Sequence, residues 1–146
     1  MKNSIWLNIF LSIGVGYLFT QLQIILETKF LINFLQNNLI TLLVALIAIN
    51  SATLSIVLTK IRELIDKSES NIDFSNTKKQ MILSINEQIT LIAVSMIFLM
   101  LLDSSFIKNN PDYISLIHTF IIGCFVYAVR VLYDTAKSVF VILDYE

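Results

Sequence analysis

The stretch from Asn38 to Lys60 constrains the fold of this chain more than any other. It holds no formal charge between Asn38 and Thr59. A helix needs about 20 consecutive apolar residues to cross the hydrocarbon core of a bilayer, and this stretch is long enough. The sequence therefore predicts a transmembrane helix over residues 38–59.

Small and weakly polar residues recur along this predicted helix with gaps of 4, 3, 4, 3 and 4, so they share one face. Water provides no hydrophobic drive between helices inside a membrane. Such a face therefore either lets another helix approach closely or leaves room and hydroxyl groups along a wet path. We call these residues the small-residue stripe and expect them, with Asn50 beside them, to line a pore or to pack against another helix: Thr41, Ala45, Ala48, Ala52, Ser55 and Thr59.

The composition agrees with a membrane protein. Of the 146 residues, 56% are hydrophobic and 14% charged, and the mean hydropathy is +0.78. These values lie outside the range of soluble globular domains. The length indicates one domain over residues 1–146. The single cysteine, Cys124, lies in an apolar run and has no partner for an internal disulfide.

Three further apolar runs predict spans at about residues 5–26, 84–102 and 113–133. The first is longer than the apolar part of a signal peptide and no A-x-A site follows it, so we interpret it as a retained span. It carries a small and polar ridge with a period of four residues, and residues 27–38 suggest a short amphipathic segment at the membrane interface. The expected fold is an all-α membrane protein, an antiparallel four-helix bundle with helical extensions in a cytoplasmic hairpin over residues 60–83.

The distribution of Lys and Arg predicts the orientation, because basic residues concentrate on the cytoplasmic side. With both termini in the cytoplasm, only Lys29 and Lys108 lie outside. The richness in Ile, Asn and Lys suggests an AT-rich bacterial gene, hence a multi-pass protein of the inner (plasma) membrane. The eight basic residues on or near the cytoplasmic side are Lys2, Lys60, Arg62, Lys67, Lys78, Lys79, Arg130 and Lys137.

Enzymatic interpretations find little support. The sequence contains no G-x-S-x-G, H-E-x-x-H or P-loop pattern. His118 is the only histidine, which excludes a bis-histidine haem site or a histidine-rich metal cluster within one chain. A hydrogen-bonded structural histidine near the outer end of the fourth span is the favoured interpretation. We predict no enzyme, no cofactor and no metal site.

Glu87 and Arg130 are ionisable groups within or close to predicted spans, where charges usually find partners. Spans three and four are antiparallel, and counting from the polar turn between them places residue 85 level with Arg130. The sequence thus predicts an interhelical charge pair between Glu87 and Arg130 near the inner boundary. A pair between Arg130 and Asp134, one turn apart on one helix, is the competing prediction.

Basic residues gather in the cytoplasmic hairpin, at Lys60, Arg62, Lys78 and Lys79. They suit contact with anionic lipid headgroups. A site for an anionic ligand, such as a nucleotide or oligonucleotide, is a second interpretation, since a symmetric oligomer would multiply these charges around its axis. Interleaved acidic residues in the same segment favour the first.

A single four-span bundle fills its interior with side chains, so conduction would need several copies around a central axis. Our first hypothesis is a homo-oligomeric ion channel or pore that contacts lipid, itself and possible cytoplasmic protein or ligand partners. Pore-forming effectors of phage-defence systems are of this general type, although no motif supports that analogy. The alternative is a non-conducting membrane anchor or assembly subunit. A proton-coupled exporter ranks third, because no Asp or Glu lies near the middle of any span.

Overall fold

The computed structural model describes residues 2–67 and 75–143, and this part of the chain is helical without strands. Four long helices carry the fold, and a short helix and one 3₁₀ turn connect the last two. The elements are α1 (Lys2–Ile25), α2 (Phe30–Lys67), α3 (Ser75–Asp103), α4 (Ser105–Asn109), η1 (Pro111–Tyr113) and α5 (Ile114–Leu143). The predicted all-α fold is confirmed.

The four long helices each contain a segment that is long and apolar enough to cross a membrane. The predicted multi-pass membrane protein with four spans is therefore confirmed at this level. The candidate spans are Ile5–Ile25, Phe30–Glu63, Lys78–Asp103 and Pro111–Lys137. The tip of the predicted hairpin, residues 68–74, lies outside the described residues.

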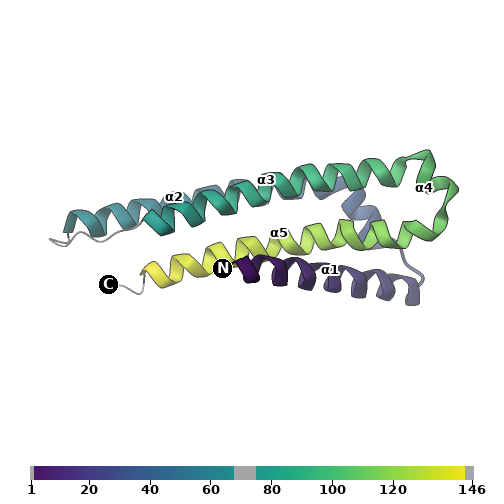
Figure 1. Ribbon diagram of the computed structural model, residues 1–146, viewed down its shortest axis with the longest axis horizontal. Helices are drawn as coiled ribbons and strands as arrows, with labels where there is room; N and C mark the ends of the chain where they lie inside the picture. The colour runs from purple at the N-terminus through teal and green to yellow at the C-terminus, as the bar shows by residue number, and fades with distance from the viewer. Residues whose placement is uncertain (1, 68–74, 144–146) are drawn as a thin grey trace.

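The long helices run side by side and alternate in direction (Figure 1). The start of α1 and the ends of α2 and α5 lie toward one end of the bundle, and α4 lies at the other. Helix α5 packs against α1, α2 and α3, whereas α1 packs mainly on α5. Half of the apolar segment of α5 is buried, against 11–22% in the other three helices, so α5 is the central helix.

The main core lies between α2 and α5, with Ile107 of α4 at the end of the bundle where α3 finishes. A second cluster joins the far end of α2 to the start of α3 through Ile61 and Met81. The buried apolar residues of α2 lie three or four positions apart, except for one interval of eleven that the buried Asn50 divides into seven and four, so they form one helix face. They are Ile32, Leu35, Leu39, Leu43, Leu54, Val57 and Ile61.

Residues 27–38 do not form the separate interfacial segment that the sequence suggested. Helix α2 already begins at Phe30 and continues without a break through residue 38. Ile32 is 2% exposed and Leu35 is 0% exposed, and both belong to the main core. The prediction was wrong because no Gly or Pro interrupts the helix here, and because the apolar side chains find a protein partner instead of the membrane surface.

Helices α1 and α5 approach closely at two glycines. A Cβ atom on Gly16 would lie 2.5 Å from the carbonyl oxygen of Thr119 and 2.9 Å from the nitrogen of Gly123. Thr119 donates a hydrogen bond to Thr20 at 3.3 Å beside this contact. The face of α1 used here is the ridge that the sequence indicated, with Ser12, Gly16 and Thr20 all buried.

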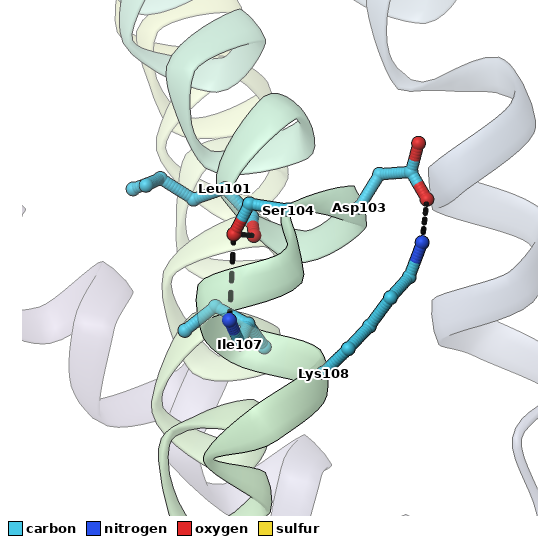
Figure 2. Close-up of polar contacts among 5 residues, drawn as sticks. All are labelled: Leu101, Asp103, Ser104, Ile107 and Lys108. Atoms are coloured by element: carbon cyan, nitrogen blue, oxygen red, sulfur yellow. Dashed lines mark hydrogen bonds and ion pairs between the residues drawn. The ribbon is translucent and has the colours of Figure 1, made fainter.

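The corner between α3 and α4 is held by polar contacts among residues 101–108 (Figure 2). Ser104 caps α4: its Oγ accepts a hydrogen bond from the nitrogen of Ile107 at 3.4 Å and donates one to the carbonyl of Leu101 at 2.6 Å. Lys108 Nζ lies 2.8 Å from Asp103 Oδ1 in an exposed ion pair. The charges of Lys108 and Asp103 at this turn are therefore paired with each other.

Candidate functional sites

The small-residue stripe faces away from the rest of the chain. All six residues, Thr41, Ala45, Ala48, Ala52, Ser55 and Thr59, are exposed. The core face of α2 lies on the opposite side, because each residue advances a helix by about 100° and the two sets are offset by two positions. Among the described residues, no other helix covers the stripe.

Two hydroxyl groups of this stripe donate hydrogen bonds within α2 itself. Ser55 donates to the carbonyl of Ser51 at 3.0 Å, and Thr59 donates to the carbonyl of Ser55 at 3.1 Å. The hydrogen of each of these hydroxyl groups is therefore already bonded. Ser55 and Thr59 can therefore meet lipid or another helix without the cost of an unpaired donor.

Asn50 does not share this face. It is 0% exposed and points into the bundle. Its Nδ2 donates to Ser84 Oγ at 3.1 Å and to Gln88 Oε1 at 3.0 Å, both on α3. Ser84 Oγ also lies 3.5 Å from Thr135 Oγ1 of α5. Asn50, Ser84, Gln88 and Thr135 form an intramembrane polar cluster that joins three helices.

Two polar atoms of this cluster remain unpaired. Asn50 Oδ1 and Gln88 Nε2 are buried and have no hydrogen-bond partner among the described residues. One is an acceptor and the other a donor. The sequence indicated Asn50 as a polar residue of the second span, but its two partners on α3, and the contact of Ser84 with Thr135 of α5, were not predicted.

Glu87 and Arg130 do not form the predicted charge pair. Within the described part of the chain, Glu87 instead accepts a hydrogen bond from the Tyr127 hydroxyl at 3.5 Å. Arg130 Nε is buried without a hydrogen-bond partner there. Tyr127 lies three residues before Arg130 on the same face of α5, so the level and the face were close, but the Tyr127 hydroxyl makes the contact with Glu87.

The four basic residues predicted for a cytoplasmic contact lie around the second apolar cluster. Ile61 and Met81 bring the end of α2 and the start of α3 together. Lys60 pairs with Glu63 at 3.1 Å, which offsets one of the four charges. Arg62, Lys78 and Lys79 are exposed.

A cavity of about 390 Å³ lies at the opposite end of the bundle, between the end of α1 and the start of α5. Of the residues in this region, only His118 was considered from the sequence as a candidate site residue, because the cavity arises from packing between segments about 90 residues apart. Its lining residues are Thr20, Gln23, Ile24, Glu27, Thr28, Lys29, Ile32, Pro111, Ile114, Ser115 and His118.

The described residues bring no three His, Cys, Asp or Glu side chains together in a way that could hold a metal ion. Comparison of the chain with protein-family models, curated proteins and solved structures finds no match.

Proposed function

We propose that several copies of this chain assemble in the inner membrane of a bacterial cell, with both termini cytoplasmic, and form an ion channel or pore. One observation carries the proposal: the small-residue stripe of α2 is exposed along its whole length. A membrane helix gains close contact through small residues, and here none of that contact is used within the chain.

Two arrangements use this face, and both bring the α2 helices of different copies together. In one, the stripes pack against neighbouring copies. In the other, they surround a central axis, where Thr41, Ser55 and Thr59 supply hydroxyl groups. The stripe carries no charged residue, so selectivity would depend on hydroxyl groups, constriction and charges at the mouths.

The cytoplasmic end supplies a place for regulation. Helix α2 has 38 residues, and at about 1.5 Å per residue it is roughly 57 Å long, well beyond a hydrocarbon core of about 30 Å. Its inner end carries exposed Arg62, and α3 carries exposed Lys78 and Lys79. Repeated around a symmetry axis, these charges suit an anionic ligand or partner that gates the pore.

The same helical extension favours a second candidate function. A non-conducting anchor would use the exposed cytoplasmic surface to dock a partner protein and the stripe only for packing. The two candidates differ in one observable property, which is conductance across a bilayer.

The test compares stripe variants with a matched variant elsewhere. Ala48→Leu and Ala52→Leu add bulk where copies must approach closely, at a cost of about 1–3 kcal/mol or about tenfold or more in association. Ala93→Leu makes the same change at an exposed position of α3. We expect the two stripe variants, and not Ala93→Leu, to lose oligomers by native mass spectrometry and current in planar bilayers.

The wild-type chain decides between the candidates. A strict monomer in nanodiscs would contradict both the channel and the stripe argument. Oligomers that carry no current under any ionic condition would favour the anchor. Equal effects of all three leucine variants would show that the stripe has no special role.

A further inference from the structure

The cavity at the outer end of the bundle is lined by apolar and ionisable side chains, and we call its two exposed charged residues, Glu27 and Lys29, the rim. Ile24, Ile32 and Ile114 supply apolar side chains, whereas Glu27, Lys29 and His118 supply ionisable ones. A volume of about 390 Å³ falls in the range of about 300–1,000 Å³ that small-molecule sites occupy. The mixture of one carboxylate with one ammonium group makes the lining zwitterionic.

The two charged residues of the rim, Glu27 and Lys29, do not form an ion pair with each other. Among the described residues, neither Glu27 nor Lys29 takes part in an ion pair. Lys108, the other basic residue at this end, is paired with Asp103 at 2.8 Å. Lys29 is thus the basic group at this end that remains open to a ligand.

Neutral polar groups inside the cavity add hydrogen-bonding capacity. Gln23 is 9% exposed, and its Oε1 accepts a hydrogen bond from the nitrogen of Ile32 at 3.1 Å. Its Nε2 donates to no described residue. Thr28 Oγ1 accepts from the nitrogen of Phe30 at 3.3 Å, which leaves its hydroxyl hydrogen free to donate. Both donors lie in the wall of the cavity.

The turn that ends α1 fixes the rim. Glu27 adopts a positive φ of 50°, and the nitrogen of Thr28 bonds the carbonyl of Gln23 at 3.0 Å. This pattern closes a helix and turns the chain toward α2. Large apolar side chains around the turn are exposed: Ile25 at 75%, Leu26 at 62% and Phe30 at 75%. The cavity therefore opens where an acyl chain has apolar surface beside a polar rim.

We propose that this cavity holds the headgroup of a phospholipid that carries a phosphate and a primary ammonium group, as phosphatidylethanolamine does. Lys29 and His118 bind the phosphate, with Gln23 and Thr28 as neutral donors. Glu27 binds the ammonium group, whose three N–H groups donate to a carboxylate; the methylated ammonium of phosphatidylcholine has none. The acyl chains lie along Ile25, Leu26 and Phe30. This site does not depend on oligomerisation or on conduction.

Native mass spectrometry of the full-length chain tests the site with ethanolamine, choline and glycerol phospholipids of identical acyl chains at equal concentration. We expect preferential retention of the ethanolamine lipid. Lys29→Gln should lower retention of all three lipids by about three- to tenfold, and Lys29→Arg should retain most of it. Glu27→Gln should abolish the preference for ethanolamine over choline without abolishing binding.

Lys108→Gln and Asp103→Asn are the matched controls, because they change the same charges at the same end outside the cavity. Both should bind lipid as the wild-type chain does. Equal retention of the three lipids, preference for the glycerol lipid, or equal losses in Lys29→Gln and Lys108→Gln would each overturn the proposal. Far-UV circular dichroism of every variant separates loss of binding from loss of folding.

Discussion

Asn50 and the intramembrane polar cluster tie three helices together at one level of the bundle. Both N–H groups of the Asn50 amide are used, on Ser84 and Gln88. Hydrogen bonds of this kind contribute about 0.6 kcal/mol on average inside membranes and up to about 1.7 kcal/mol. They specify a register, because an apolar slip along the helix would leave every polar atom of the cluster unpaired.

The first prediction concerns this cluster. Asn50→Leu removes both donors and leaves Gln88 Oε1 buried without its partner, so it should lower the free energy of unfolding by about 1–2 kcal/mol. Gln88→Met should have a similar effect. The double variant should lose less than the sum of the two, by at least about 0.5 kcal/mol, because no stranded polar atom remains. Denaturant unfolding in mixed micelles measures all three.

Thr90→Ala is the control for this cycle, since Thr90 is exposed on α3 outside the stripe and bonds its own helix. It should leave the unfolding midpoint almost unchanged. Strict additivity of the two core substitutions would show that the amides of Asn50 and Gln88 act independently.

At the level of single residues, the sequence predicted position along the membrane better than the contact that each residue makes. Phe98 stacks on Phe120 at 4.8 Å between ring centroids, and Ser84 lies 3.5 Å from Thr135. These two contacts place Arg130 within a few residues of the level of Glu87. Tyr127 and Arg130 share one face of α5, and counting residues cannot say which of the two contacts Glu87; the Tyr127 hydroxyl does.

The crossing of α1 and α5 depends on the absence of two side chains. Gly16 and Gly123 let the backbones approach, and Ser12, Thr20 and Thr119 fill the contact with small polar groups. Van der Waals contact and interhelical hydrogen bonds drive association of helices in lipid, so closeness matters more here than apolar area. Helix α1 has little other contact with the bundle, and this crossing holds it in place.

The second prediction compares two glycines on α1. Gly16→Ala places a Cβ atom 2.5 Å from a backbone carbonyl oxygen, which the helices can relieve only by moving apart. We expect a loss of about 1–3 kcal/mol in the free energy of unfolding, measured by denaturant titration in detergent.

Gly14→Ala is the matched control, because nothing lies within 4 Å of the added atom. Alanine is the better helix former, so this variant should be neutral or slightly stabilising. A Gly16→Ala protein as stable as the Gly14→Ala protein would mean that α1 and α5 can move apart at this crossing without loss of free energy of unfolding.

Helix α2 shows why the presence of a helix could be predicted from the sequence, whereas the face that it buries could not. Two opposite faces of this helix repeat at intervals of three and four, one of small residues and one centred on Leu39, Leu43, Leu54 and Val57. In a soluble protein, polarity would mark the outer face. In a membrane both faces are apolar, so periodicity alone cannot say which of them packs within the chain.

Within one chain, the four long helices do not cover all of one another's apolar surface. Half of the apolar segment of α5 is buried, but only 11–22% of the apolar segments of α1, α2 and α3 is buried. Lipid can cover large side chains such as those of α1 and α3. The small-residue stripe of α2 offers lipid little contact area, and this is the physical reason for proposing self-association at that face.

The last prediction concerns the orientation of this bundle. Lys60, Arg62, Lys78 and Lys79 belong to the end where α2 finishes and α3 starts, and Lys108 lies on α4 at the other end (Figure 1). The positive-inside rule places the first end in the cytoplasm. Single cysteines at Lys79 and Ser105, both exposed, report each end in a Cys124→Ala background. In intact cells a membrane-impermeant maleimide should label Ser105→Cys, whereas Lys79→Cys should react only after lysis.

Cys124 is buried, so its replacement must first be shown to preserve folding. Labelling of Lys79→Cys from outside would invert the bundle, and Arg62, Lys78 and Lys79 could then no longer receive a cytoplasmic ligand. The small-residue stripe and the cavity between α1 and α5 would remain as described, since neither depends on which end of the bundle faces the cytoplasm.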